Sequence, residues 1–408
     1  MTDKVINKSK AEEEGETGHI LPPYKHEIFE TFDEMGVNEK VLRGVYALGF
    51  ENPSSIQKRA IVPVSLGYDI IAQSQSGTGK TATFTIGCLQ RVDPSIKAPQ
   101  MVVLAPTREL ATQNHKVCTD LADYLDIKIC LCIGGEPLDE NIKELDRGAH
   151  VVIGTPGRIY DLMKRWALKT DHLKSVVLDE ADEMLTRGFK EQVYDICNYI
   201  PPESESYSVQ FCLFSATIPD EVLEVTEQFM KESKVRILVK KEELTLEGIK
   251  QYFVAVEKEY WKLDTLTDIY THLTVDQAII YTNTKRKAIE LTDKLRAADF
   301  SVVCIHSDMS QHERNRVIRD FKIGTERILI ATDIIARGID VQQVSLVINY
   351  DLPKFKETYI HRIGRSGRYG RKGMAINFAT STDLKLIDEY RNFYMTKISE
   401  MPHDFTKL

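Results

Sequence analysis

Short, nearly continuous apolar runs recur along this chain of 408 residues, and they constrain its fold more than any other feature. In the first part of the chain these runs are MVVL at 101–104, KICLCI at 128–133, VVI at 151–153, VVL at 176–178 and FCLF at 211–214. Longer stretches with helical patterning separate them. Strands that are apolar throughout are typical of a parallel sheet covered by helices on both faces. The sequence therefore predicts an α/β fold.

The alternation pauses once, in the charged stretch VKKEELTLEG at 239–248, and then restarts. The second set of runs is AIIY at 278–281, VVCI at 302–305, ILI at 328–330, LVI at 346–348 and AINF at 375–378. We therefore predict two tandem α/β domains, at 21–238 and 249–408, joined by a linker at 239–248. Residues 1–20 are polar and acidic and are expected to form a disordered tail.

With 42% hydrophobic and 28% charged residues, the composition suits a globular protein. No apolar run approaches the roughly 18 residues needed to span a bilayer, and the first residues lack the apolar core of a signal peptide. The seven cysteines include no C-x-x-C pair, which favours reduced, packed thiols over disulfides or a zinc site. We therefore expect a cytoplasmic or nuclear protein without a membrane partner.

The stretch SQSGTGKT at 74–81 stands between an apolar run at 70–72 and a helical pattern at 81–86. This order of strand, glycine-bearing loop and helix is the setting of a phosphate-binding loop. Gly77 and Gly79 let the backbone amides converge on an anion, Lys80 supplies a positive charge, and the Thr81 hydroxyl offers a ligand for Mg²⁺. Because the general pattern has glycine where this chain has Ser74, a chance glycine-rich turn stays the alternative on this stretch alone.

Two adjacent acids, Asp179 and Glu180, directly follow the apolar run at 176–178. In a triphosphatase, the first acid of such a pair holds Mg²⁺ through water, and the second orients or deprotonates the attacking water. Asp179 and Glu180 fit these two roles. The alternative is an acidic helix N-terminus stabilised by the helix dipole.

The segment HRIGRSGR at 361–368 repeats arginine at three-residue spacing. Arginines spaced in this way point to one side of a helix or turn, and we predict that they reach a γ-phosphate bound in the other domain as arginine fingers. The alternative is a solvated basic turn.

Charge gives only a weak indication of a nucleic-acid partner. The net charge is −8, but residues 250–408 hold 25 Lys and Arg against 21 Asp and Glu. A mildly basic second domain suits phosphate binding, although ordinary scatter of surface charge explains it equally well.

Taken together, these motifs make the chain similar to the DEAD-box RNA helicases, from about Phe32 to Phe378, and residues 179–182 spell the family's name. The resemblance implies two tandem RecA-like domains, ATP and Mg²⁺ as cofactors, and an RNA-dependent ATPase that acts as a helicase. It implies that Phe50 packs on the adenine and that Gln57 bonds its edge; without this context Gln57 would be a surface glutamine. It also implies nucleotide contacts from Ser76 and Thr78 in the phosphate loop.

The same resemblance assigns the remaining motifs. Gly338 and Asp340, in the motif RGID at 337–340, would complete the nucleotide site, and Arg365 and Arg368 would be the arginine fingers. Ser215, Thr217, Asp182 and His361 would couple hydrolysis to domain closure. The implied RNA contacts, each also compatible with an ordinary turn or helix cap, are Pro106, Thr107, Arg108, Gly135, Thr155, Pro156, Arg158, Arg314, Thr332 and Asp333.

Within the family, the string VKKEELTLEGIK and the short flanks resemble a compact subgroup that includes a translation initiation factor and its nuclear exon-junction paralogue. We therefore expect local unwinding of single-stranded or short duplex RNA, in translation initiation, by a cytoplasmic monomer that works with a scaffold protein. A nuclear, ATP-gated RNA clamp in an RNA-processing assembly is the alternative, and a DNA translocase is a more distant one. Ser307 departs from the family pattern, in which glycine commonly follows the residue at His306.

Overall fold

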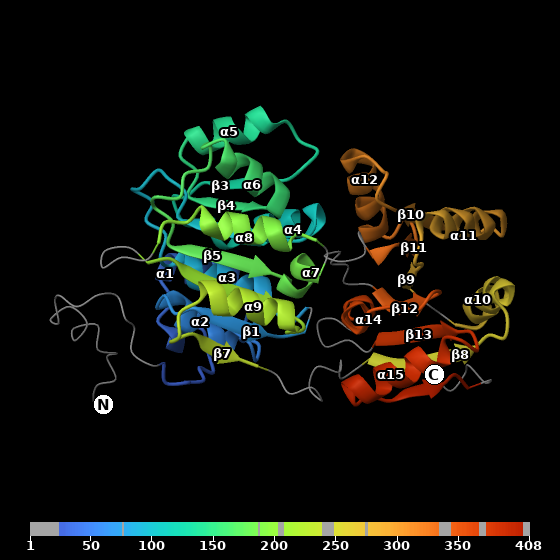
Figure 1. The fold of residues 1–408 in the computed structure, drawn as a ribbon. Coiled ribbons are helices and arrows are strands. Elements are labelled where there is room, and N and C mark those ends of the chain that lie inside the picture. The colour runs from blue at the N-terminus through green and yellow to red at the C-terminus, as the bar shows by residue number, and fades with distance from the viewer. Residues whose placement is uncertain are drawn as a thin grey trace.

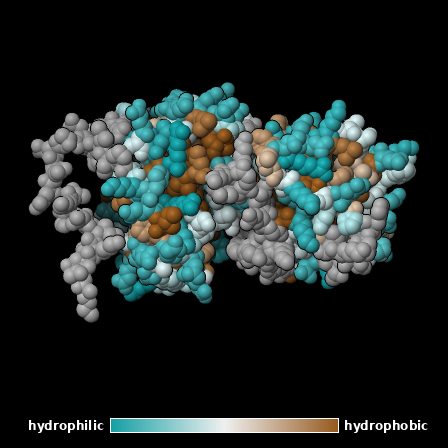
Figure 2. All heavy atoms as spheres, turned by 90° about the horizontal axis from the view of Figure 1, so that it is seen from below, coloured by the Kyte–Doolittle hydropathy of each residue, from teal (hydrophilic) through white to brown (hydrophobic). Residues whose placement is uncertain are grey.

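The computed structural model describes residues 24–75, 77–186, 188–202, 208–238, 249–273, 276–333, 344–366 and 373–402. These residues form two halves that lie side by side, a first half at 24–238 and a second half at 249–402 (Figure 1). The predicted tail and linker fall outside the described residues. Figure 2 shows hydrophilic side chains over most of the viewed face of both halves, with smaller hydrophobic areas among them.

The first half contains seven strands with helices between them. The strands are β1 (Ile70–Gln73), β2 (Met101–Leu104), β3 (Ile129–Cys132), β4 (Val151–Gly154), β5 (Ser175–Asp179), β6 (Gln210–Ser215) and β7 (Val235–Ile237). The helices are the short η2 (Asp33–Met35), α1 (Glu39–Ala47), α2 (Gln57–Ser65), α3 (Lys80–Leu89), α4 (Arg108–Leu121), α5 (Leu138–Asp146), α6 (Pro156–Lys164), α7 (Ala181–Thr186), α8 (Lys190–Asn198) and α9 (Asp220–Phe229).

The second half repeats the arrangement. Its strands are β8 (Ile249–Ala255), β9 (Gln277–Tyr281), β10 (Val302–Ile305), β11 (Ile328–Ala331), β12 (Val344–Asn349), β13 (Gly373–Ala379) and β14 (Ile398–Glu400). Its helices are the short η4 (Glu259–Trp261), α10 (Lys262–His272), α11 (Lys285–Ala297), α12 (Gln311–Lys322), α14 (Lys356–Ile363) and α15 (Leu384–Tyr394).

Both sheets are parallel throughout. The strand order is β3-β4-β2-β5-β6-β1-β7 in the first and β10-β11-β9-β12-β13-β8-β14 in the second. Every described strand pair runs parallel. The predicted α/β fold with two tandem parallel sheets is confirmed. Three strands fell outside the predicted runs: β7 and β14, which are sheet edges of three residues, and β8, where polar and apolar residues mix.

Helices cover both faces of the first sheet. Because successive strand residues point to opposite sides of a sheet, each strand contributes side chains to two cores. Met101 and Val103 face a core built with α1 to α4, whereas Val102 and Leu104 face a core built with α5 to α9. Helix α3 is buried from Ala82 to Leu89. Its Phe84 ring lies 5.4 Å from the ring of Phe214 on β6, measured between centroids. The helix that follows the glycine-bearing loop is therefore fixed firmly against the sheet.

The parallel arrangement gathers the polar motifs at one edge of the first sheet. The neighbouring registers align Gln73 with Ser215 and Asp179 with Phe214, so β1, β5 and β6 end at the same level. In Figure 1 the arrow of β5 points toward the second half, and α7 at its tip lies opposite α14. Ligands of open parallel sheets bind beyond the carboxyl ends of the strands. No helix in the described ranges is long and apolar enough to cross a membrane.

Candidate functional site

The loop between β1 and α3 has the backbone shape that an anion cradle requires. Gly77 and Gly79 adopt left-handed conformations, with φ of 82° and 92°. A Cβ atom added at Gly79 would lie 2.8 Å from Nε2 of Gln57, so a side chain there would have to displace the Gln57 amide. Gln57 itself is buried, at 3% exposure, and its Oε1 accepts a hydrogen bond of 2.7 Å from the Ser54 amide. The surface-glutamine alternative is therefore wrong for Gln57.

Ser74, the departure from the general loop pattern, adds a crosslink inside the loop. Its Oγ lies 2.5 Å from Thr78 Oγ1, and Thr78 Oγ1 donates to the carbonyl of Gln75 at 2.7 Å. The Ser74 amide donates to the carbonyl of Ser215 at the end of β6. The serine thus strengthens the loop locally. Ser76 lies outside the described residues.

Lys80 and Glu180 form a buried ion pair at the edge of the sheet. Lys80 Nζ donates to Glu180 Oε1 at 3.0 Å, and the two side chains are only 5% and 12% exposed. Burial pushes the pKa of Glu180 upward, but the charges of Lys80 and His361 and the hydrogen bond from Lys80 together outweigh burial and leave that pKa below its usual value. Glu180 also has a positive φ of 50°, a strained conformation for a residue with a side chain. Glu180 is therefore held as a carboxylate beside the loop.

Asp179 lies at the end of β5 and is almost fully buried. Burial and the neighbouring charge of Glu180 raise the pKa of Asp179 to about 7, against the opposing effects of Lys80 and of a hydrogen bond from Asn114. The Asn114 Nδ2 donates to Asp179 Oδ2 at 2.8 Å, and the Asn114 Oδ1 accepts from the Thr81 hydroxyl at 3.1 Å. Asn114 was not among the predicted site residues. The signal for it is a polar side chain at a buried position of the amphipathic helix α4.

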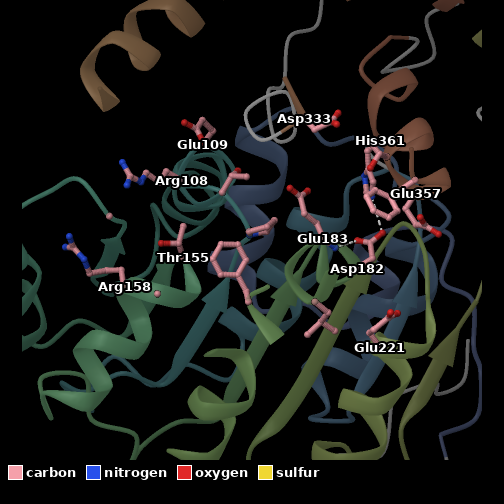
Figure 3. A pocket seen from close by; sticks show the side chains of 18 of the residues that line it. Arg108, Glu109, Thr155, Arg158, Asp182, Glu183, Glu221, Asp333, Glu357 and His361 are labelled. Atoms are coloured by element: carbon pink, nitrogen blue, oxygen red, sulfur yellow. Dashed lines mark hydrogen bonds and ion pairs between the residues drawn. The ribbon is translucent and has the colours of Figure 1, made fainter. Parts of the chain in front are cut away.

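Asp182, on α7, joins the end of β6 to the second half. Its backbone amide donates to Ser215 Oγ at 3.2 Å, and its Oδ2 accepts from the Thr217 hydroxyl at 2.5 Å. The same Oδ2 accepts a bond of 3.1 Å from His361 Nε2 on α14 (Figure 3). Burial pushes the pKa of Asp182 upward, but the contacts with His361 and Thr217 hold it well below its usual range. The residues predicted to couple hydrolysis to closure thus lie in one bonded cluster.

The structure treats the arginines of the segment at 361–368 differently from one another. Helix α14 ends at Ile363, so the three-residue spacing is not carried on one helix face. Arg362 is 1% exposed and pairs with Asp333 through two bonds of 2.6 and 2.9 Å, inside the second half. Arg365 is also buried, and its Nε donates to the carbonyl of His361 at 3.0 Å. The prediction that these arginines share one side is wrong for Arg362, because its ion pair with Asp333 turns it inward.

A cavity of about 1080 Å³ opens between the halves, next to this cluster (Figure 3). The predicted RNA contacts that line it are Pro106, Thr107, Arg108, Thr155, Arg158, Arg314 and Asp333. Gly135, Pro156 and Thr332 are not among its lining residues. Figure 3 shows Arg108, Thr155 and Arg158 on one side of the cavity and Asp182, Glu183 and His361 on the other.

Side chains from both halves meet at the cavity. Arg108 Nη1, at the start of α4, donates to Gln311 Oε1 at the start of α12, at 3.4 Å. Arg314 Nη1 lies 3.5 Å from Glu109 Oε1. Burial and the charge of Arg314 lower the pKa of Arg108, although a guanidinium stays charged in proteins. The cavity therefore has basic side chains that a phosphate backbone can contact.

Three ligating groups, those of Glu180, Asp182 and His361, lie within 4.8 Å of one another and have the chemistry of a metal site. Each group already has a protein partner. Glu180 pairs with Lys80, and His361 and Asp182 are bonded to each other. We therefore assign this trio to the contact between the halves. The oxygens of Thr81 and Asp179, beside the glycine loop, are the hard ligands that suit Mg²⁺. Gly338, Asp340 and Arg368 lie outside the described residues.

Comparisons with known proteins agree with this geometry. The chain matches the family description DEAD/DEAH box helicase over residues 54–225 and helicase conserved C-terminal domain over residues 261–370. It is 57% identical to the ATP-dependent RNA helicase eIF4A of Neurospora crassa, over 94% of this chain and 95% of that protein. It is 58% identical to eIF4A of Mycosarcoma maydis, over 92% of this chain and 90% of that protein.

Solved structures give the same result. The structure of Saccharomyces cerevisiae Dbp5 bound to RNA and ADP BeF3 superposes with a TM-score of 0.84 at 36% identity, over 93% of this chain and 97% of that one. The structure of Mss116p bound to single-stranded RNA and AMP-PNP superposes with a TM-score of 0.84 at 25% identity, over 95% of this chain and 83% of that one. The fold and the site define a nucleotide-dependent helicase with two RecA-like halves. This chain belongs to the DEAD-box family of ATP-dependent RNA helicases, as its resemblance predicted, and is similar to proteins named eIF4A.

Proposed function

We propose that this chain is an RNA helicase of translation initiation, in which binding of ATP and Mg²⁺ closes the two halves around RNA and separates short duplexes locally. The observation that carries the proposal is the buried bond from His361 to Asp182. It joins α14 of the second half to the acidic motif, whose neighbouring Glu180 pairs with Lys80 of the phosphate loop. The state of the nucleotide site and the contact between the halves therefore share one set of side chains.

The residues of the first half fit a nucleoside triphosphate with its metal ion. Gly77 and Gly79 present the loop backbone to phosphate, and Lys80 supplies a fixed positive charge. When bound, Mg²⁺ would neutralise charge on the β- and γ-phosphates. Thr81 and Asp179 would hold it, partly through water. Phe50, half-buried against the first core, and Gln57 would hold the adenine, with Ser76, Thr78, Gly338 and Asp340 completing the nucleotide contacts.

We assign hydrolysis to Glu180. Its lowered pKa keeps it ionised near neutral pH, as a group that orients or deprotonates an attacking water must be. Lys80 would contact the γ-phosphate from its place beside Glu180, so that its charge still favours the ionised carboxylate. Arg365 and Arg368 would stabilise the charge that develops on the transferred phosphoryl group, an effect worth about 10³- to 10⁵-fold in rate for an arginine finger.

The RNA would lie in the cavity between the halves. Arg108, Arg158 and Arg314 line it and suit sugar-phosphate contacts, together with the hydroxyl of Thr155. The remaining contacts would come from Pro106, Thr107, Gly135, Pro156, Thr332 and Asp333. Recognition of this kind reads the backbone and its 2′-hydroxyls rather than the bases. A strand gripped from two halves in this way is bent away from its partner, which opens a short duplex.

The placement in translation initiation rests on the names of the relatives. These relatives are named as initiation-factor helicases, and they are 55–58% identical to this chain over nearly its whole length. We propose a cytoplasmic monomer, with domains at 21–238 and 249–408, that works with a scaffold protein. Structures of Dbp5 in complex with Gle1 and Nup159 are among the structural relatives, and they support partner binding by this fold.

The test is phosphate release from ATP without nucleic acid, with single-stranded RNA and with DNA of matched sequence. We expect RNA alone to stimulate the wild-type chain and Glu180→Gln to abolish turnover while ATP and RNA still bind. Normal turnover by Glu180→Gln would contradict the assignment. Equal stimulation by DNA would point to the translocase alternative, and RNA-stimulated hydrolysis without unwinding of a short duplex would point to an ATP-gated clamp.

A further inference from the structure

Asn114 is a buried polar side chain that the proposed mechanism does not use. It lies on α4, in the middle of the first half, with 0% exposure. Leu110 and Cys118, one helical turn to either side, share its buried face and are apolar. An amide at such a position requires partners for both ends, because leaving a buried polar group unpaired is destabilising.

Both ends of the amide meet the proposed metal ligands. Nδ2 donates to Asp179 Oδ2 at 2.8 Å, and Oδ1 accepts from the Thr81 hydroxyl at 3.1 Å. These two residues come from different elements, since Thr81 follows the phosphate loop on α3 and Asp179 ends β5. Asn114 is therefore the bridge that fixes their relative position from a third element.

The direction of these bonds determines how the oxygens face. The ionised form of Asp179, which is the form that can hold a metal ion, only accepts, so the amide then presents its N–H group to Asp179 and its oxygen to Thr81. The Thr81 hydroxyl then donates its single proton to Asn114 and keeps its lone pairs for another partner. Asp179 likewise has Oδ2 fixed by the Asn114 amide, which sets the orientation of the whole carboxylate. A hydroxyl whose proton is donated to a protein acceptor keeps its oxygen lone pairs available, and a metal ligand needs such lone pairs.

We infer that Asn114 is a positioning residue for Mg²⁺, which orients the Thr81 hydroxyl and the Asp179 carboxylate so that both present oxygen lone pairs to the ion. This inference rests on the proposed nucleotide site. Residues that hold metal ligands in place contribute about 10- to 100-fold in metal affinity. A role confined to packing α4 against α3 would leave the affinity for Mg²⁺ unchanged.

The experiment measures the affinity of a fluorescent ADP analogue across a titration of MgCl₂ and, separately, in EDTA. The variant is Asn114→Leu, which keeps the size of the side chain and removes both hydrogen bonds. We expect the Mg²⁺ concentration for half-maximal effect to rise about 10-fold or more, while the affinity in EDTA changes less than about twofold. The matched control is Cys118→Ala, which disturbs the same buried face of α4 one turn further on and should leave the Mg²⁺ dependence as in the wild type.

A double-mutant cycle with Thr81→Val separates positioning from packing. If Asn114 acts through the Thr81 hydroxyl, Asn114→Leu has less effect in the Thr81→Val background than in the wild type. The same Mg²⁺ dependence in Asn114→Leu and wild type, or full additivity in the cycle, would overturn the inference and leave the proposed function standing. Nucleotide binding by the wild type that does not respond to Mg²⁺ would overturn both.

Discussion

The bond between His361 and Asp182 predicts a specific defect. The substitution His361→Ala removes the Nε2 donor, while Asp182 Oδ2 still accepts from the Thr217 hydroxyl and amide. The bond joins residues 179 positions apart, on different halves, and both side chains are 1% exposed. It therefore contributes free energy only when the halves are in contact. The first half by itself, including the nucleotide loop, is unchanged by the substitution.

The size of the defect follows from the burial of this bond. A hydrogen bond to a charged group contributes roughly 1.5–3 kcal/mol. Each 1.4 kcal/mol corresponds to a factor of ten in an equilibrium constant, so the equilibrium constant for closure falls about 10- to 100-fold. Because RNA binds both halves in the proposed mechanism, its affinity in the presence of an ATP analogue falls by the same factor.

The assay is fluorescence anisotropy of labelled single-stranded RNA, with a non-hydrolysable ATP analogue and with ADP. We expect His361→Ala to weaken RNA binding about 10- to 100-fold with the analogue, and to leave the affinity for ADP alone as in the wild type. His272→Ala, which removes an exposed histidine at the end of α10, is the matched control. Unchanged RNA affinity of His361→Ala with the ATP analogue would refute the argument that this bond links nucleotide and RNA binding.

Two further predictions concern the first half alone. The folded-state pKa of Asp179 is raised to about 7, above the unfolded value of about 3.9, so the free energy of unfolding falls as pH rises between these values. We therefore expect Asp179→Asn, measured in EDTA, to raise the melting temperature at pH 8 and to leave it nearly unchanged at pH 4. An equal shift at both pH values would contradict this expectation. Gly79→Ala places a Cβ within 2.8 Å of Gln57 Nε2 at a φ of 92°. We therefore expect loss of ADP-analogue binding, measured by calorimetry, and a destabilisation of about 1 kcal/mol or more. Wild-type affinity would show that the loop can rearrange.

The fold was largely predictable because strands buried on both faces need apolar residues throughout. The runs at 101–104, 151–153 and 176–178 all became central strands of the first sheet. The same rule missed β8, which lies inside the second sheet but carries Lys250 and Gln251. Gln251 is buried nonetheless, because its side chain accepts from the Tyr359 hydroxyl. Hydropathy alone cannot show that a polar residue has such a partner.

The candidate site was predictable where a motif is continuous in the chain, as in the phosphate loop and the acids at 179–182. It was not predictable where one side chain arrives from a distant element. Asn114 is 33 residues from Thr81 and 65 from Asp179, so their contact exists only in the folded chain. Arg362 shows the opposite error, because its spacing from Arg365 suggested a shared role that its ion pair with Asp333 excludes. Spacing along the chain does not determine the direction of a side chain at a helix end.

Polar contacts join the described residues of the two halves: the bond of His361 to Asp182, the bond of Arg108 to Gln311 and the pair of Arg314 with Glu109. Because both halves belong to one chain, with β7 ending at Ile237 and β8 beginning at Ile249, each half stays near the other whatever the strength of the contact. Covalent connection thus allows the contact itself to be weak. In the proposed mechanism, the halves could then close often enough for ligands to bind the closed state, and open again in every round of ATP hydrolysis.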